Sequence, residues 1–178
     1  VTSTTIVGNS GDDRITGTAL ADNIYGGTGA DEVSGGLGAD YFGFSQGDSP
    51  VTLVNTGSDG VLNTGDTFSF AGGKADVVHG RFDVAGGGGD RIQLIAAANS
   101  PGLTALSTAP ANGLVGDQQF YTVRGNYVNG VFAVDTTSGV DTLVVYDGDG
   151  SAGVSQTALV VQGHAPSSLT VSGSMLYA

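Results

Sequence analysis

The chain of 178 residues is long enough for one domain or two small ones, and it contains no cysteine, which excludes disulfides and thiolate metal sites. Its formal net charge is −12, and its five basic residues form no run or stripe, so nucleic-acid binding is disfavoured. An acidic polysaccharide or an anionic membrane would be repelled unless a cation bridged the two, and no apolar run of about 18 residues is present to span a membrane.

The acidic residues are almost all aspartate, because Glu32 is the single glutamate among 17 acids. Either residue would serve for solubility. Aspartate differs in that it tolerates the left-handed backbone conformation and accepts hydrogen bonds from its own turn. The bias therefore indicates roles in turns or as ligands.

The chain begins at Val1 with no methionine, no charged segment and no apolar segment. We therefore expect a fragment of a longer protein that carries no N-terminal signal peptide. Residues 1–7 alternate as a strand would, and they lead into the most regular part of the sequence.

Residues 8–43 read as four successive nonapeptides, GNSGDDRIT, GTALADNIY, GGTGADEVS and GGLGADYFG. Glycine opens each nonapeptide, aspartate holds the sixth place, and an apolar residue holds the eighth. This is the G-G-x-G-x-D-x-U-x pattern of a calcium-binding parallel β-helix. Glycine allows the sharp turns that aim carbonyl oxygens at a cation, and aspartate adds a hard anionic oxygen. The last three places predict a short strand with its central side chain in the core.

Two nonapeptides complete one turn of a flattened coil, so loops two repeats apart should stack about 4.8 Å from each other. This geometry predicts that Asp13 pairs with Asp31 on one edge, and Asp22 with Asp40 on the other. The predicted calcium (Ca2+) ligands are these four aspartates and the loops before them. The loop positions are Gly8, Asn9, Ser10, Gly11, Gly17, Ala19, Gly26, Gly27, Thr28, Gly29, Gly35 and Leu37.

Departures from the pattern bear on these ligands. Thr18 and Leu20 replace the second-place and fourth-place glycines of the second loop, which is therefore the weakest ligand set. Asp48 lies where it could extend the stack beneath Asp31, but its register is off by one, so a ligand and a turn residue remain equal alternatives. The nine residues FSQGDSPVT contain Pro50, which interrupts a strand ladder, so we expect the coil to end there.

The predicted fold is all-β: a parallel β-roll over residues 1–52 and a capping, sandwich-like region of short, mostly antiparallel strands over residues 53–178, forming one continuous domain. Residues 44–64 are expected to be irregular, and residues 96–118 to be a long loop with a helical turn near residues 103–107. Turns are expected at Gly125-Asn126, at Asn129-Gly130 and over residues 147–150. The strands after the roll are expected at residues 67–70, 76–78, 81–83, 90–94, 119–123, 127–135, 141–146 and 157–162.

The nonapeptides and the segments after them resemble the RTX (repeat-in-toxin) family of bacterial type I secreted proteins. This family commonly shows aDvI-x-x-F-D and G-x-D-r-I-x-L after its repeats, which stand here at residues 75–83 and 89–94. Residues 116–163 look like the capping part of serralysin-like modules. The resemblance implies a β-roll with calcium between stacked loops, export through a type I secretion apparatus by an uncleaved C-terminal signal, and a place outside the cell or on its surface.

For the other aspartates, a role in a turn is weighed against metal binding. Asp76, Asp83 and Asp90 are expected to be turn residues rather than ligands. Asp147 and Asp149 resemble the start of an EF-hand loop, but Ala158 stands where that loop needs a bidentate glutamate, and the flanks read as strands. A hairpin turn or a lone weak calcium site is the better interpretation.

We expect no enzyme here. The zinc motif H-E-x-x-H of serralysin-like proteases is absent, His79 and His164 are expected to be ordinary surface or loop residues, and no nucleophile elbow occurs. The expected function is a calcium-binding module that folds on calcium outside the cell and carries the C-terminal secretion signal of a larger protein. Two alternatives remain. One is a calcium-dependent assembly or adhesion module of a surface-layer protein or adhesin, with self-association or surface polysaccharide contacts through calcium, and the other is the non-catalytic tail of a secreted enzyme.

Overall fold

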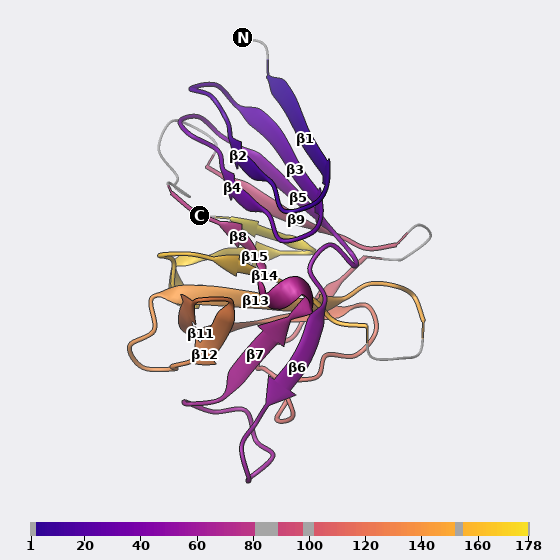
Figure 1. The fold of residues 1–178 in the computed structure, drawn as a ribbon, viewed down its shortest axis with the longest axis vertical. Helices are drawn as coiled ribbons and strands as arrows, with labels where there is room; N and C mark the ends of the chain where they lie inside the picture. Colours follow the sequence, from indigo (N-terminus) through magenta and orange to yellow (C-terminus); the bar gives the residue numbers. More distant parts are fainter. Residues whose placement is uncertain (1–2, 81–88, 98–101, 152–154, 178) are drawn as a thin grey trace.

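The computed structural model describes residues 3–80, 89–97, 102–151 and 155–177, and strands make up most of its regular structure (Figure 1). The helical elements in these ranges are two single turns, η1 (Ala71–Gly73) and η2 (Pro166–Ser168). Neither has the length or apolar character to cross a bilayer. The all-β prediction is confirmed.

The nonapeptides form a coil whose strands alternate between two sheets. In the first sheet β1 (Thr4–Ser10), β3 (Asp22–Thr28) and β5 (Tyr41–Ser45) pair in parallel, and in the second sheet β2 (Arg14–Thr16) pairs in parallel with β4 (Glu32–Ser34). Paired residues are 18 apart in each case, so two nonapeptides make one turn of the coil, as predicted. The eighth-place residues Ile15, Ile24, Val33 and Phe42 are buried between the sheets.

The coil does not end after the nonapeptides, and that prediction is wrong. β8 (Asp76–Val78) continues the second sheet in parallel with β4, and β9 (Arg91–Ile95) continues the first sheet in parallel with β5. Both sheets are therefore continuous across the predicted boundary at residue 52. The chain leaves the coil after β5 and later returns with two more strand segments, which the loss of the glycine pattern conceals. The predicted strand at residues 81–83 lies outside the described residues.

The excursion between β5 and β8 is itself a hairpin rather than an irregular connection. β6 (Val51–Asn55) pairs antiparallel with β7 (Thr67–Phe70), at the end of the second sheet. Pro50 directly precedes this edge strand, a position where its missing N–H is tolerated.

The capping strands are mostly antiparallel, as predicted. β11 (Gln119–Val128) pairs with β12 (Val131–Val134) and β13 (Asp141–Asp147), and β13 pairs with β14 (Thr157–Val161). The hairpin turn falls at Asn129-Gly130, whereas Gly125-Asn126 lies inside β11, against the prediction. A Cβ at Gly125 would overlap the Phe132 ring, so glycine here permits close packing on β12. The predicted helical turn is instead β10 (Thr104–Ala105), parallel to β11.

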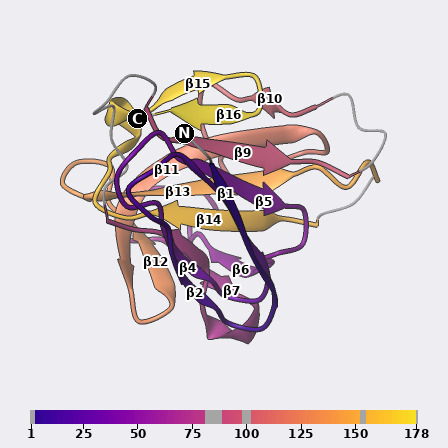
Figure 2. The ribbon, with the colours of Figure 1, turned by 90° about the horizontal axis from the view of Figure 1, so that it is seen from above.

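Two hydrophobic cores lie on opposite faces of the central strands. On β13, Val144 and Tyr146 pack into the core between the two sheets, whereas Leu143 and Val145 pack into a second core on the far side. Seen from above, β13 and β14 lie between β9 and the β6–β7 hairpin (Figure 2). Burial on both faces explains why these strands read as continuous apolar runs.

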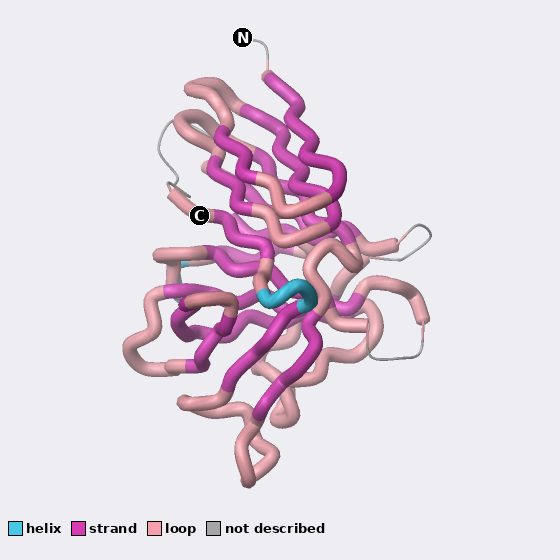
Figure 3. The backbone as a smooth tube through the Cα atoms, viewed as in Figure 1, coloured by secondary structure: helices cyan, strands magenta, loops and turns pink. Residues whose placement is uncertain are grey.

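The last residues of the chain complete the first sheet. β15 (Thr170–Ser172) and β16 (Met175–Tyr177) form a hairpin, and β16 pairs antiparallel with β9. Leu176 is fully buried in the core between the sheets. The roll thus occupies one end of the molecule and the β6–β7 hairpin the other (Figure 3).

Replacing Leu176 with alanine should destabilise the calcium-saturated protein by about 2–4 kcal/mol, because the change leaves a cavity in the core. Urea unfolding followed by circular dichroism measures this. Val171→Ala in the same hairpin is the matched control, since Val171 is 40% exposed and its loss should cost less than about 1 kcal/mol. Equal effects of the two changes would contradict the packing of β16.

Candidate metal centre

The nonapeptide loops stack along two edges of the roll. We call the stack of loops 8–13 and 26–31 the first edge, and the stack of loops 17–22 and 35–40 the second edge. On the first edge Gly11 N donates to Thr28 O at 2.8 Å, and on the second edge Leu37 N donates to Thr18 O at 3.0 Å. The structure therefore places Asp13 with Asp31, and Asp22 with Asp40, as the sequence predicts.

A ladder of carboxylates links successive turns on the first edge. Asp13 N donates to Asp31 Oδ1 at 2.8 Å, and Asp31 N donates to Asp76 Oδ1 at 2.9 Å. The second edge repeats the arrangement, since Asp22 N donates to Asp40 Oδ1 at 2.9 Å and Asp40 N donates to Asp90 Oδ1 at 2.9 Å. Asp31, Asp40, Asp76 and Asp90 thus each use one carboxylate oxygen to hold the backbone of the turn before.

The other oxygen is buried and unsatisfied on the first edge. Oδ2 of Asp13, of Asp31 and of Asp76 is buried with no hydrogen-bond partner among the described residues. Burial raises the pKa of Asp76 to about 8, against lowering by the hydrogen bond from Asp31 N, and the charges of Asp31, Asp48 and Asp12 raise it further. Burial likewise raises the pKa of Asp31. Three buried carboxylate oxygens without donors form an arrangement that a cation would satisfy.

Backbone carbonyls converge on the same space. A Cβ added at Gly8 would overlap Gly26 O and lie 2.6 Å from Asp13 Oδ2, so both oxygens approach one point. Gly27, with φ +107°, and Gly29, with φ +128°, leave room for the carbonyls of Asn9 and Gly11 in the same way. Side chains at these glycines would fill the space between the loops.

The donor set fits calcium. Oxygen atoms from carboxylates and carbonyls suit a hard cation that takes six to eight oxygen ligands in adaptable geometry, and the chain has no thiol that would select a softer metal. On the first edge the positions of Gly8, Asn9, Ser10, Gly11, Asp13, Gly26, Gly27, Thr28, Gly29 and Asp31 lie together, and on the second edge those of Gly17, Ala19, Asp22, Gly35, Leu37 and Asp40.

Asp48 lies beneath the loop that contains Asp31. Gly29 N donates to Asp48 O at 3.3 Å, and the Asp48 carboxylate accepts Ser45 N at 2.6 Å. Burial raises the pKa of Asp48, the hydrogen bond from Ser45 lowers it, and the charge of Asp31 raises it, so the two carboxylates face a common region. Its turn therefore replaces a regular third loop on this edge.

In the second loop, which lacks two of the pattern's glycines, the aspartate is hydrogen-bonded within its own loop. Thr18 donates to Asp22 Oδ2 through both its backbone N, at 2.6 Å, and its hydroxyl, at 2.9 Å. The protein itself therefore satisfies the oxygen that is left without a partner on the first edge.

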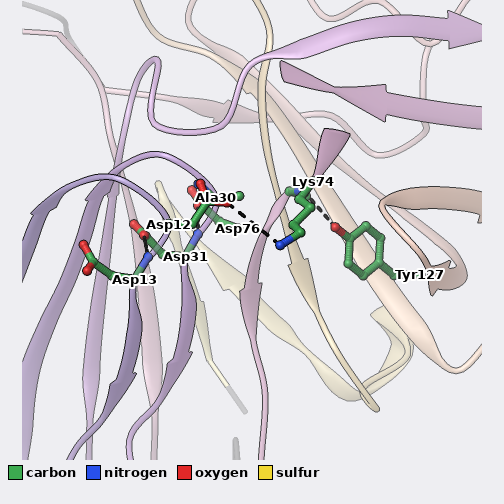
Figure 4. A network of polar contacts seen from close by, with 8 residues as sticks. Asp12, Asp13, Ala30, Asp31, Lys74, Asp76 and Tyr127 are labelled. Atoms are coloured by element: carbon green, nitrogen blue, oxygen red, sulfur yellow. Dashed lines mark hydrogen bonds and ion pairs between the residues drawn. The ribbon is translucent and has the colours of Figure 1, made fainter. Parts of the chain in front are cut away.

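Asp76, Asp90 and Asp12 lie near the predicted sites, and the sequence did not predict this. Asp76 and Asp90 were expected in turns, but each takes the sixth place of a further coil turn, and Asp83 lies outside the described residues. One sequence feature could have identified Asp76 and Asp90. Each stands two residues before an apolar residue, Val78 or Ile92, as the sixth-place aspartates of the nonapeptides do. Asp12 joins the first edge through Oδ1, which accepts Ala30 N at 3.0 Å (Figure 4).

A separate acidic cluster lies in the capping region. Carboxylate oxygens of Asp117, Asp147 and Asp149 lie within 4.8 Å of one another. Both oxygens of the buried Asp147 accept long backbone hydrogen bonds, from Asp149 at 3.5 Å and from Ser155 at 3.3 Å. These bonds organise the connection after β13, and a lone calcium site there stays a prediction.

Comparison with known proteins bears on the first four loops. The family model of the RTX calcium-binding nonapeptide repeat matches residues 7–42 in four copies, about a fifth of the chain. A comparison with curated proteins found no similar sequence. The matched residues contain the four loops in which the carboxylate ladders begin. Asp76 and Asp90, which continue the ladders, and the serralysin-like resemblance of the capping region lie beyond the match. Residues 7–42 are therefore RTX calcium-binding nonapeptide repeats, folded as a β-roll that binds Ca2+.

Proposed function

We propose that this chain is a calcium-dependent folding module at the C-terminal end of a larger secreted bacterial protein. It stays unfolded inside the cell, leaves through a type I secretion apparatus directed by a signal in its last residues, and folds on calcium outside. The observation that carries this proposal is the row of buried Oδ2 atoms of Asp13, Asp31 and Asp76 with no donor among the described residues.

These carboxylates oppose folding without a cation. The ion pairs among the described residues join Arg14 to Glu32 at 3.3 Å and Lys74 to Asp12 at 3.9 Å, and neither reaches Asp31 or Asp76. Burying an ion without compensation costs several kcal/mol, and the glycine-rich loops lose additional chain entropy on ordering. Calcium held by Asp13, Asp31, Asp48 and Asp76 and by loop carbonyls offsets both terms, so binding and folding become one equilibrium.

The free calcium concentration determines whether the module folds. Extracellular calcium modules bind with dissociation constants of about 10⁻⁴–10⁻³ M. At about 1 mM free calcium, a site with a dissociation constant of 10⁻⁴ M stabilises the folded state by about 1.4 kcal/mol, whereas micromolar calcium contributes almost nothing. Several sites together therefore supply enough free energy to switch the marginal stability of a small domain.

On this proposal the segment is not an enzyme. Its apolar C-terminal hairpin packs on β9, so the residues proposed as the secretion signal would be readable only in the unfolded chain. Self-association, a calcium-bridged surface polysaccharide and a role as the tail of a secreted enzyme stay predictions from the sequence.

Removing calcium should unfold most of the roll. We expect a β-type circular dichroism spectrum in 5–10 mM calcium (a range chosen to exceed about 10⁻³ M) and loss of most of it in chelator, with heat released when calcium is titrated back. A complete β spectrum in chelator, or no heat on titration, would contradict the proposal.

Asp31→Asn separates calcium binding from general acidity. The amide still accepts the hydrogen bond from Asp13 N but removes one anionic ligand, so calcium affinity should fall on the order of tenfold or more. Asp59→Asn is the control, because Asp59 lies in an exposed turn and should leave affinity unchanged.

The metal-free fold should become less stable as pH rises. In that fold Asp76 holds its proton up to about pH 8, whereas in the unfolded chain it releases it near pH 3.8, so between these values the folded state binds more protons. The free energy of unfolding therefore falls with increasing pH. In chelator we expect more of the β-type circular dichroism signal to remain at pH 5 than at pH 8, and Asp76→Asn should flatten this dependence. A residual β signal that rises with pH would be the contrary result.

Gly27→Ala tests the space between the loops. Gly27 and Gly65 have nearly the same φ, +107° and +105°, but a Cβ would overlap Asn9 O at Gly27 and meet nothing within 4 Å at Gly65. Both changes strain the backbone, whereas only the first crowds the loops. We expect Gly27→Ala to lose about 1–3 kcal/mol more stability in calcium than Gly65→Ala, together with calcium affinity. Equal losses in denaturant melts and calorimetry would remove the argument.

A further inference from the structure

A groove runs along the outer face of the second sheet, beside the first edge. Its main part has a volume of about 580 Å³, and a second part of about 230 Å³ continues it past His79 and Gln162. Both parts share Arg14, Glu32 and Tyr127. These residues have no place in the calcium sites.

The register of the second sheet creates the floor of this groove. Arg14, Glu32, Val77 and Val160 are successive partners across β2, β4, β8 and β14, so their side chains lie in one row on the outer face. At the capping end Val77 and Val160 are covered by the second core, whereas Arg14 and Glu32 emerge beyond it. The groove marks the place where the outer face leaves the cover of the core.

The β11–β12 hairpin forms a fixed wall. Tyr127 Oη accepts Ala75 N at 2.8 Å, drawn as the dashed line at the Tyr127 hydroxyl in Figure 4. The Tyr127 ring contacts the Phe70 ring edge-on with centroids 6.1 Å apart. A Cβ at Gly130 would overlap Gly73 O, so the hairpin turn lies directly against the segment before β8. A wall held at three points keeps the groove open and pre-formed.

The lining offers hydrogen-bond donors and acceptors without a dominant charge. Its two cations are paired, Arg14 with Glu32 and Lys74 with Asp12. An anion would meet the carboxylates and a cation the basic groups, so neither class is favoured. The amides of Asn129 and Gln162 both donate and accept, and the Tyr127 hydroxyl keeps its own proton for donation.

These features select a neutral polyhydroxylated ligand. Each sugar hydroxyl donates and accepts one hydrogen bond, which matches paired ions and side-chain amides, and the C–H face of a sugar ring can pack on the Tyr127 ring. The floor is the outer face of β2, β4 and β8, where side chains rather than backbone groups meet a ligand, so the strand pairing that holds an extended peptide is not used on this face. We propose that this groove binds a neutral oligosaccharide chain.

The proposal rests on the proposed calcium-dependent folding, because Asp12, Asp13 and Ala30 at one end of the groove belong to the loops of the first edge. The groove therefore exists only in the calcium-loaded fold. Sugar binding should require millimolar calcium even though the ligand is uncharged.

The test is a titration of the isotope-labelled, calcium-loaded chain with maltohexaose, cellohexaose and mannohexaose, followed by backbone amide NMR. We expect at least one hexasaccharide to shift the amides of Tyr127, Asn129 and Gln162 and to saturate at millimolar concentration or below. No shift with all three, shifts confined to other surfaces, or shifts of the same amides by an acidic peptide alone would overturn the proposal.

Two variants sharpen the test without touching the calcium loops. Gln162→Ala removes an exposed amide, and Asn129→Gly removes another at a residue whose φ of +52° glycine adopts freely. Each should weaken sugar binding about threefold to tenfold, whereas Asn55→Ala on exposed β6 should not. Calcium calorimetry on the same samples separates the two proposals. Calcium heat without sugar shifts overturns only the groove, and absent calcium heat overturns both.

Discussion

The whole fold depends on one hydrogen bond, repeated once per coil turn, from the backbone N–H of one sixth-place aspartate to the carboxylate of the next. On the first edge it runs from Asp13 to Asp31 and from Asp31 to Asp76, at 2.8 and 2.9 Å. A charged acceptor makes this bond stronger than a neutral one. The same bond stacks the carboxylates on top of one another. The contact that orders the loops therefore also brings negative charges together, and a cation is needed to offset their repulsion.

The hydrogen bonds of the ladder do not depend on the length of chain between the aspartates that they join. Asp31 and Asp76 are 45 residues apart, and Asp40 and Asp90 are 50 apart, yet their hydrogen bonds match those of aspartates 18 residues apart. The entropy of closing a loop grows only slowly with its length, so insertions between coil turns are tolerated. The β6–β7 hairpin occupies one such insertion and ends the second sheet, and the capping strands join the coil where β14 pairs with β8.

The outer face of the second sheet is exposed to solvent at one end and buried at the other. At β2 and β4 its outer face is in solvent, where Arg14 pairs with Glu32, whereas at β14 the same face is covered by the second core. The groove and the Tyr127 wall lie at this transition. The calcium edge and the groove therefore share loop 8–13, which couples a surface without charge preference to the ion-dependent part of the molecule.

The sequence by itself determined the coil. Glycine, aspartate and apolar residues at fixed places in each nonapeptide predict the 18-residue register, the partners of Asp13 and Asp22, and the burial of Ile24 and Phe42, because each of these features depends on local spacing. The antiparallel capping strands and the Asn129-Gly130 turn also follow from local pattern. Thr18 and Leu20 mark the second loop as a departure from the pattern, and that it is the weakest ligand set stays a prediction.

Only the tertiary structure decided what depends on distant partners. Asp76 and Asp90 were expected in turns because no glycine repeat surrounds them, and their role becomes visible only when β8 and β9 pair with strands more than 40 residues earlier. Gly125 looked like a turn residue, but the close approach of Phe132 requires glycine inside a strand. The periodicity of the sequence predicts which side chains face inward. It does not predict which later segment pairs with a given strand, because that pairing depends on how the two cores pack.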